Sequence, residues 1–386
     1  MEGHEEMNKM LQLAGVDTLL SNGGKTVPLS SVEGKMTCLF FSAHWCRPCR
    51  NFTPELLQIY TNLRNTSKNI EIIFVSLDHD ESSFVDHFKG MPWLALRFDT
   101  CLTQKLCAYF DVEHIPALVP LLVTLSGGFG FIEDAVQLVE EYGVDAYPFS
   151  ANRRAELKAL DEARIQGGKL QELLGCKERD YVTSADGIKI PIASLIGKTV
   201  GLYFGAHWCP PCCAFTKQLR EVYNELTILS PGSFEVIFIS IDRNKQEFHT
   251  SLNTMPWLAI PYPGTNRQEL TRIFAIKGIP ALMVLGPDGK VLKTDGRTVI
   301  TTYGSMAFPS TESRVSEVEA VLKKEGDKLP HRVNDPRHEH ELELDMANAY
   351  VCDDCQEQGR YWAFTCKQCN FDLHPSCVGE STLDNI

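Results

Sequence analysis

The sequence predicts an α/β protein made of two copies of one domain, each a mixed central sheet flanked by helices, with a small third domain at the C-terminus. Two observations support this prediction. Four short landmarks occur twice in the same order, 163 or 164 residues apart, in a chain of 386 residues. A repeat of that length indicates a duplicated domain, since it is far too long for a solenoid. The last fifty or so residues are instead rich in Cys and His and poor in aliphatic runs.

The landmarks divide the chain into segments. They are Trp-Cys-x-Pro-Cys at 45–49 and 208–212, an apolar run ending in Ser-x-Asp at 72–78 and 236–242, Met-Pro-Trp-Leu-Ala at 91–95 and 255–259, and Ile-Pro-Ala-Leu at 115–118 and 279–282. We expect a first domain at 10–150, a charged helical connector at 151–172, a second domain at 173–326 and a tail domain at 337–380. A polar linker is expected between the last two.

Each copy has the same expected order of elements. An apolar strand leads into the Cys motif and a helix follows it. A β-branched run then forms a buried strand, and a second helix comes after it. The Ile-Pro segment opens a hairpin, which in the second copy turns at Gly286-Pro287-Asp288-Gly289. Strands that alternate with helices and end in a hairpin indicate a mixed sheet. The predicted helices are 51–63 and 81–89 in the first copy and 214–226, 245–252 and 313–324 in the second.

Composition narrows the class of protein. Apolar residues make up 44% and charged residues 23% of the chain, as in ordinary soluble domains. The net charge of -13 argues against general affinity for nucleic acid or anionic membranes. The sequence has no run of about 18 apolar residues, so we expect no membrane span. The acidic start at 1–6 does not look like a secretory signal. The fourteen cysteines therefore indicate a reducing compartment, where cysteine pairs are more often catalytic or metal-binding.

The two Trp-Cys-x-Pro-Cys motifs predict redox chemistry. Two cysteines separated by two residues at a strand-to-helix turn can close and reopen a disulfide, and the helix N-terminus stabilises the first thiolate. We expect Cys46 and Cys209 to be the nucleophiles and Cys49 and Cys212 to resolve the mixed disulfide. The alternative is that each pair is half of a zinc site, but neither copy offers a second pair of ligands.

Neighbouring residues are expected to support each centre. A proline before the second cysteine fits the first turn of the helix. Arg47 in the first copy stands where the second has Pro210, so the two centres should differ in thiolate stability and reduction potential. The supporting residues are Trp45, Arg47 and Pro48 in the first copy and Trp208, Pro210 and Pro211 in the second.

These motifs resemble those of the thioredoxin superfamily, within it the nucleoredoxin and tryparedoxin branch. With its tail, the chain resembles a plant nucleoredoxin of the two-domain type over nearly its whole length. The resemblance implies a thiol-disulfide oxidoreductase that acts on protein disulfides in cytoplasm and nucleus. It also implies that Pro116 and Pro280 are cis prolines facing the dithiols, although most X-Pro bonds in proteins are trans and both could be ordinary turn prolines.

One feature departs from the resemblance. Many members of the superfamily carry a buried Asp five residues before the motif Trp, where it accepts a proton from the second cysteine. Phe40 and Tyr203 occupy that position here. His44 and His207, directly before each Trp, are the nearest titratable candidates, although both can equally be surface residues beside the site. The proton acceptor therefore stays open.

The tail carries eight residues of the types that ligate zinc. Structural zinc takes four N or S ligands, so eight suit two ions. The spacing resembles a divergent plant form of the C1 family, which interleaves its sites along the chain. That resemblance assigns Cys352, Cys355, His374 and Cys377 to one ion. The other ion would take Cys366 and Cys369 with histidines, for which His338 and His340 are available.

Together these patterns predict a protein-disulfide reductase with a zinc-binding tail. No nucleotide-binding Gly motif is visible, so NADPH is expected to act only through a separate donor of the thioredoxin-reductase type. The expected partners are therefore disulfide-containing proteins and that reductase. The alternative is a redox-sensing binding or scaffold protein whose dithiols switch its affinity for partners. An oxidase or isomerase is a third possibility, which needs a more oxidising compartment.

Overall fold

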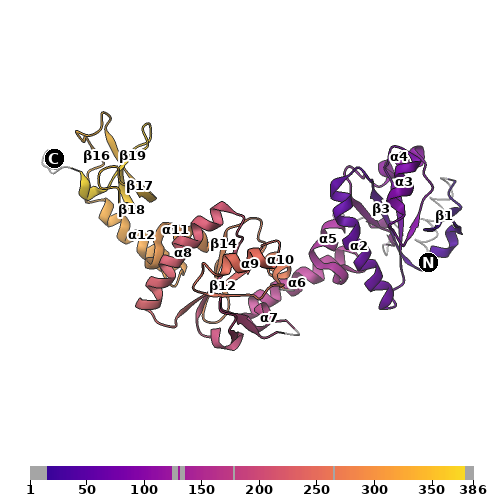
Figure 1. Cartoon of the computed structure of the whole chain (residues 1–386), viewed down its shortest axis with the longest axis horizontal. Coiled ribbons are helices and arrows are strands. Elements are labelled where there is room, and N and C mark those ends of the chain that lie inside the picture. Colours follow the sequence, from indigo (N-terminus) through magenta and orange to yellow (C-terminus); the bar gives the residue numbers. More distant parts are fainter. Residues whose placement is uncertain (1–14, 124–128, 131–134, 177–178, 264–265, 379–386) are drawn as a thin grey trace. The chain divides into compact units, whose positions relative to one another are not determined.

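The computed structural model describes residues 15–123, 129–130, 135–176, 179–263 and 266–378, and the chain forms two compact units, Met1–Leu160 and Asp161–Ile386 (Figure 1). The expected first domain begins at residue 10 and the expected tail domain ends at residue 380, both outside the described residues. The predicted domain boundaries stay predictions. None of the described helices is long and apolar enough to cross a membrane.

The first unit contains a mixed sheet whose described strands follow the order β2-β1-β5-β4-β3-β6. β3 runs parallel to β4 and antiparallel to β6. The strands are β1 (Thr18–Leu20), β2 (Thr26–Pro28), β3 (Met36–Ser42), β4 (Ile70–Ser76), β5 (Leu94–Ala95) and β6 (Ala117–Pro120), with β7 (Leu122–Val123) and β8 (Phe129–Gly130) paired separately. The helices are α2 (Arg47–Asn65), α3 (Glu81–Phe88), α4 (Thr100–Tyr109), α5 (Ala135–Tyr142) and the 3₁₀ turns η1 (Leu29–Val32) and η2 (Gly143–Ala146), followed by α6 (Ala151–Gly167), which continues into the second unit.

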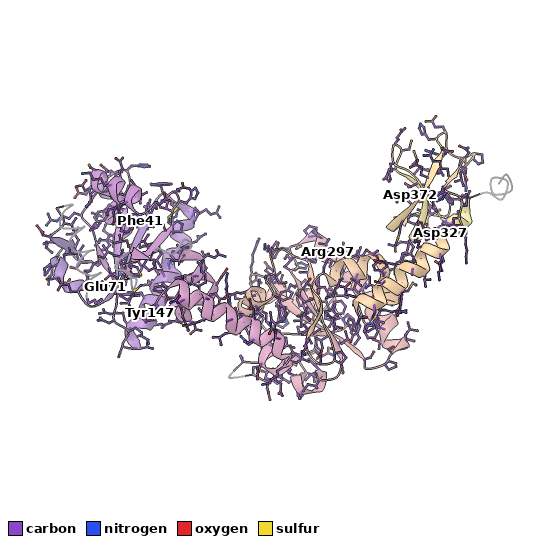
Figure 2. All side chains as sticks on the ribbon, turned by 180° about the vertical axis from the view of Figure 1, so that it is seen from behind. Phe41, Glu71, Tyr147, Arg297, Asp327 and Asp372 are labelled. Atoms are coloured by element: carbon purple, nitrogen blue, oxygen red, sulfur yellow. A yellow bond between two sulfur atoms is a disulfide. The ribbon has the colours of Figure 1, made fainter. Side chains whose placement is uncertain are left out.

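Alternate residues of the central strands face opposite layers of helices. In β3, Cys38 and Phe40 pack into a core with α2, α3 and α5, whereas Leu39 and Phe41 pack on the other face, with α4. All four side chains are fully buried, and Phe41 is labelled in Figure 2. Burial on both faces explains why these strands are almost continuously apolar.

The second unit repeats this arrangement, with the strand order β10-β9-β13-β12-β11-β14-β15. The strands are β9 (Tyr181–Thr183), β10 (Lys189–Pro191), β11 (Thr199–Gly205), β12 (Phe234–Ser240), β13 (Leu258–Ala259), β14 (Ala281–Leu285) and β15 (Val291–Lys293). The helices are α7 (Leu170–Leu174), η3 (Ile192–Leu195), α8 (Pro210–Leu229), α9 (Lys245–Leu252), α10 (Arg267–Ile273), α11 (Gly296–Tyr303), η4 (Gly304–Ala307) and α12 (Glu312–Gly326). The predicted hairpin joins β14 to β15, with Gly289 at φ 76° in its turn. The duplicated mixed α/β fold is thus confirmed.

The helices after the Cys motifs begin earlier than the sequence predicts. α2 begins at Arg47 because Cys46 is its N-cap, and Pro48 lies in the first turn, where a missing N–H costs nothing. α8 likewise follows Cys209 directly, with both prolines in its first turn. The motif is therefore the start of the helix itself.

The tail forms a small antiparallel sheet that packs on the helices of the second unit. Its elements are β16 (Arg332–Val333), β17 (Leu342–Val351), β18 (Gln358–Cys366), β19 (Phe371–Leu373) and the turn η5 (Pro375–Cys377). β16 lies in the segment expected to be a linker, because Val333 is needed in the small core beside Leu342 and Phe364. The linker is thus shorter than predicted.

Three neighbouring residues of β18 hold the tail to the second unit. The Trp362 indole Nε1 donates to the Leu322 carbonyl at 2.9 Å. The Tyr361 hydroxyl donates to the carbonyl of Tyr303 at 3.0 Å, and Arg360 pairs with Glu221. Trp362 also lies directly over Gly326, the last residue of α12.

Candidate redox centres and metal sites

The first cysteine pair lies at the N-terminus of α2. Cys46 is the N-cap, and its Sγ accepts the Cys49 backbone N–H at 3.2 Å. The two cysteines are joined in a disulfide, and both are buried. The Cys46 Sγ also lies 3.6 Å from the Ile115 carbonyl oxygen, so the pair adjoins the Ile-Pro loop. The helix N-terminus and this N–H favour negative charge on the Cys46 sulfur.

The second pair has the same position at the start of α8. The Cys212 Sγ lies 2.6 Å from the Cys209 Sγ, and the Cys209 Sγ lies 3.8 Å from the Ile279 carbonyl. Burial, together with the hydrogen bond to Cys209, raises the pKa of Cys212 to about 12. The second thiol therefore keeps its proton and can donate it toward the first sulfur.

The predicted supporting residues surround both pairs. The Ile115–Pro116 and Ile279–Pro280 bonds are cis, as the resemblance implied. Pro48, Pro210 and Pro211 lie in the first helical turns. The remaining supporting residues, Trp45, Trp208 and Arg47, are exposed.

The two motif tryptophans have different partners. Trp45 stacks on His79, with ring planes 6° apart and centroids separated by 5.6 Å. Trp208 instead lies beneath the Arg243 guanidinium, 4.8 Å from the ring centroid. Both partners follow the Ser-x-Asp strand ends. The second centre therefore has a guanidinium cation at a place where the first has an imidazole ring.

A buried aspartate holds each Cys loop, and its role in the site was not predicted from the sequence. In the first copy, Asp78 Oδ1 accepts the His44 backbone N–H at 2.7 Å and Oδ2 accepts the Ser76 hydroxyl at 2.8 Å. Asp242 makes the same contacts with His207 (2.7 Å) and Ser240 (2.7 Å). The repeated Ser-x-Asp was the available signal, because β4 and β12 end beside the strands that lead into the motifs.

The aspartates differ in their third neighbour. The His87 Nδ1 lies 3.7 Å from Asp78 Oδ2, whereas in the second copy the Ser251 hydroxyl donates to Asp242 Oδ2 at 3.0 Å. Burial by itself raises the pKa of Asp78, but the neighbouring His87 ring, the His44 amide and the Ser76 hydroxyl outweigh it, so the pKa is lowered on balance. Asp78 is thus held as a carboxylate beneath the redox loop.

The positions that depart from the superfamily pattern are not equivalent either. The Tyr203 hydroxyl donates to the Cys212 carbonyl at 3.1 Å and contacts Thr216. Phe40 lies wholly in the apolar core. His44 and His207, the candidate proton acceptors, are exposed and contribute their backbone N–H groups to the aspartates.

A second cation lies near the first centre. Arg50 donates from its guanidinium to the His44 carbonyl. At the matching place in the second copy, the Cys213 thiol contacts the His207 carbonyl at 3.5 Å. Cys213 is exposed. The first centre thus has both Arg47 and Arg50 nearby.

The structure gathers the tail residues into two sets of four potential metal ligands. Within each set the ligand atoms all lie within 4.8 Å of one another. The two sets are Cys352, Cys355, His374 and Cys377, and His338, His340, Cys366 and Cys369. Each set of four N or S donors has the chemistry that structural zinc requires, and the interleaved order is that of the C1 resemblance.

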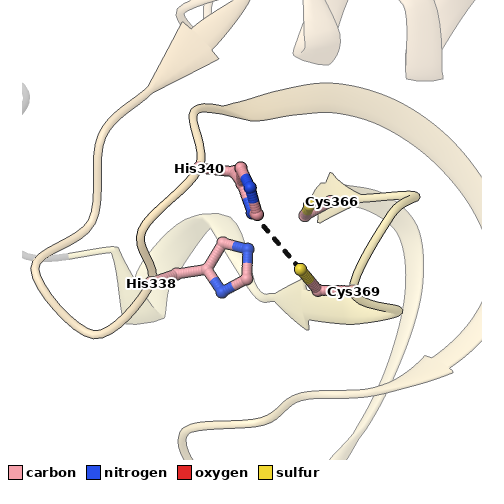
Figure 3. Close-up of side chains that lie close together, drawn as sticks. All are labelled: His338, His340, Cys366 and Cys369. Atoms are coloured by element: carbon pink, nitrogen blue, oxygen red, sulfur yellow. Dashed lines mark hydrogen bonds between the residues drawn. The ribbon is translucent and has the colours of Figure 1, made fainter.

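The geometry within each set also suits a cation. His340 Nδ1 lies 3.3 Å from Cys369 Sγ, and His338 Nε2 is buried without a hydrogen-bond partner among the described residues (Figure 3). In the other set, His374 Nδ1 lies 3.3 Å from Cys355 Sγ. Burial raises the pKa of Cys352, but backbone N–H groups, including that of His374, outweigh it and lower the pKa to about 7. The Cys352 sulfur is therefore favoured as the thiolate, the form that binds metal.

Comparison with known proteins identifies the family. A profile described as thioredoxin-like matches residues 34–122 and 197–291, and a C1 domain profile matches 336–378. A protein from Oryza sativa subsp. japonica named probable nucleoredoxin 3 is 72% identical over 351 residues, covering 91% of this chain and 74% of the relative. The chain belongs to the nucleoredoxin family.

Two more distant nucleoredoxins are consistent with this assignment. The Arabidopsis thaliana probable nucleoredoxin 3 is 52% identical over 375 residues, covering 97% of this chain and 95% of the relative. Nucleoredoxin of Danio rerio is 30% identical over 346 residues, covering 86% and 76%. A crystal structure of native tryparedoxin I from Crithidia fasciculata matches with 34% identity and a TM-score of 0.32, covering 34% of this chain and 90% of the other. This is a thioredoxin-like oxidoreductase family, with a C1 domain at the C-terminus of this chain.

Proposed function

We propose that this protein reduces disulfides in other proteins by dithiol exchange at two centres, Cys46–Cys49 and Cys209–Cys212. One observation carries the proposal. In each copy the first cysteine is the N-cap residue of a long helix, and its buried partner lies one turn further on. The carbonyl before the cis proline approaches the first sulfur within about 4 Å, at 3.6 Å and 3.8 Å. A substrate chain lying against that loop would present its disulfide to the first sulfur.

The reaction transfers two electrons from the dithiol to the substrate disulfide. The Cys46 or Cys209 thiolate attacks one substrate sulfur, forms a mixed disulfide and releases the other as a thiolate. Cys49 or Cys212 loses its proton to solvent and attacks the first cysteine, which breaks the mixed disulfide and releases the second substrate thiolate. The two substrate thiolates take up protons from solvent. The substrate leaves as a dithiol and the protein keeps an internal disulfide. In the second centre the high pKa of Cys212 keeps this thiol protonated until the mixed disulfide forms.

An outside donor has to reduce the internal disulfide again. We place NADPH behind a separate reductase of the thioredoxin-reductase type, because the sequence has no nucleotide-binding Gly motif. Protein disulfides as substrates follow from the thioredoxin-like resemblance of the two motifs, and the many cysteines support a reducing compartment, the cytoplasm and the nucleus.

The tail is proposed to hold two structural zinc ions, one at each set of four ligands. Zinc would supply Lewis-acid bonds that fix the loops of a domain whose apolar core is small. All four donors in each set come from the protein, which leaves no open position for catalysis. We therefore assign the tail a structural role.

Serine substitutions in the full-length chain test the reductase. With dithiothreitol as the electron donor, the double variant Cys46→Ser, Cys209→Ser should reduce insulin no faster than dithiothreitol alone. Either change alone should leave part of the activity, because the other centre is intact. Full activity in the double variant would remove these two residues as nucleophiles. Slow turnover combined with dithiol-dependent capture of partners would favour the redox-sensing alternative.

A further inference from the structure

A groove lies beside the cis proline in each copy, at the same place relative to the redox pair. In the first copy, Pro116 lines a groove of about 710 Å³ together with residues 109–114 and helix α5. In the second, Pro280 lines a groove of about 410 Å³ together with helix α11. The preceding carbonyl contacts the first sulfur of each pair. The polypeptide next to a reacting disulfide would therefore lie in or beside these grooves.

The first groove is acidic, and the two cations near centre one, Arg47 and Arg50, are not part of its lining. Asp111, Glu113 and Glu140 line it, all three are exposed, and none makes an ion pair with another described residue. Glu140 also acts on Glu55 in helix α2: burial raises the pKa of Glu55, and repulsion from the Glu140 carboxylate raises it further. His114 is the one histidine in the lining.

The second groove lacks this acidic character. Arg297, labelled in Figure 2, lines it near the start of α11, and it makes no ion pair within the part of the chain that the structure describes. The rest of its polar lining consists of four threonine hydroxyls and the Asp295 carboxylate, which accepts the Thr298 N–H at 3.2 Å, so the lining itself holds one charge of each sign. Lys277 is exposed in the loop that leads to the cis proline.

The sequence repeat shows that the charges are replaced position by position. Lys277 stands where the first copy has Glu113, at the offset of 164 that also relates the two cis prolines. Helices α5 and α11 both end in a Tyr-Gly pair, which aligns Arg297 with Val136 and Thr301 with Glu140. The two copies thus keep the same backbone and exchange acidic side chains for basic or neutral ones.

We propose that the two centres divide protein substrates by charge. Centre one prefers disulfides flanked by lysine or arginine, and centre two prefers disulfides flanked by aspartate or glutamate. This inference rests on the proposed reductase function and adds a substrate class to each centre. Each exposed charge pair contributes little binding energy, but together such pairs speed the association of oppositely charged proteins and peptides, and salt screens this effect. Two or three of them should together give roughly a threefold to tenfold preference at low ionic strength.

The test uses full-length protein with one centre disabled. Cys209→Ser with Cys212→Ser leaves centre one, and Cys46→Ser with Cys49→Ser leaves centre two. Each protein is reduced, freed of reductant and mixed with excess of one of two synthetic peptides. The peptides share one intramolecular disulfide and differ only in flanks of three lysines or three glutamates. The second-order rate constants should favour the lysine peptide at centre one and the glutamate peptide at centre two, with both preferences shrinking in 0.5 M salt.

Charge reversal at the loops that lead to the two cis prolines, compared with charge reversal elsewhere, separates local recognition from net charge. Glu113→Lys should weaken or reverse the preference of centre one, and Lys277→Glu that of centre two. Asp17→Lys and Lys245→Glu make comparable changes to net charge at exposed positions outside both grooves and should leave the ratios unchanged. Circular dichroism of each variant checks that it is folded.

The outcomes distinguish this inference from the proposed function. If neither single-centre protein reduces either peptide, the reductase proposal fails. If both reduce the peptides but show the same order of preference, the division by charge is wrong while the reductase stands. Equal effects of the groove variants and their controls would also overturn it, because net charge rather than the groove would then set the preference.

Discussion

Replacing Gly326 by alanine sets two physical effects against each other. Gly326 ends helix α12, and alanine is about 1 kcal/mol better than glycine in a helix, somewhat less at its end. A Cβ at this position would however lie 2.2 Å from Cζ2, 2.6 Å from Cε2 and 2.7 Å from Cη2 of Trp362. Carbon atoms in contact normally stay about 3.5–4.0 Å apart. The indole would therefore have to move away by more than about 1 Å.

That movement has a calculable cost. It opens the 2.9 Å hydrogen bond from Trp362 Nε1 to the Leu322 carbonyl, which contributes about 1 kcal/mol net. Overpacking of this kind costs a further ~1–3 kcal/mol. Subtracting the gain in helix propensity leaves a net loss of about 1–3 kcal/mol in the attachment of the tail to α12. The sign is opposite to that expected from propensity alone.

Hydrogen exchange in the full-length chain measures this loss locally. Peptides covering α12 and β18 should exchange faster in Gly326→Ala by the factor that corresponds to the lost free energy of opening. Gly167→Ala is the matched control, because Gly167 also ends a helix but has no atom within 4 Å of an added Cβ. It should be neutral or stabilising.

A double substitution tests the stated cause. In a Trp362→Ala background the clash is absent, so Gly326→Ala should become neutral or stabilising. The reasoning would be refuted if Gly326→Ala exchanged as slowly as wild type, or if it destabilised α12 equally without the indole.

Three other predictions concern the redox centres. Cys49→Ser and Cys212→Ser should each trap mixed disulfides with target proteins, and folded variants that capture none from a cell lysate on non-reducing gels would count against the reductase. In the second copy a proline stands where the first has Arg47. Replacing Arg47 by proline should slow alkylation of reduced Cys46 near neutral pH by roughly twofold to threefold, because one exposed cation that favours the thiolate is lost. An unchanged rate would contradict this. Asp78→Asn should lower the free energy of unfolding by about 1–3 kcal/mol at neutral pH. Because folding lowers the pKa of Asp78, the difference from wild type in urea titrations should shrink as pH falls below about 4. A difference that does not depend on pH would exclude the carboxylate as its cause.

Structural features that depend on short stretches of sequence could be predicted. The mixed sheet followed from the buried apolar runs and the hairpin signal, and the two ligand sets followed from spacing and resemblance. The helix starts were placed late because the motif was treated as a turn before the helix. The first cysteine of each motif is instead the N-cap residue, so the helix begins at the next residue.

Features that depend on distant residues were not predictable in the same way. Asp78 lies 34 residues from the His44 amide that it accepts, and only the fold brings them together. The attachment of Trp362 to α12 likewise has no local signal, because a glycine at a helix end and a tryptophan in a strand are each unremarkable alone. The spacing of the ligand residues suggested a tail domain that stands alone, whereas Tyr361 and Trp362 of the tail contact the helices of the preceding domain.

The interleaving of the two ligand sets has a consequence for how the tail assembles. Each set joins one end of the segment 338–377 to its middle, and half of the ligands of the other set lie inside the loop that it closes. An ion bound at either set shortens the loop that the second ion has to close, which lowers the entropic cost of the second closure. Zinc uptake should therefore be cooperative, with few singly loaded molecules at equilibrium. Oxidation of any one of the five ligand cysteines would then release both ions together.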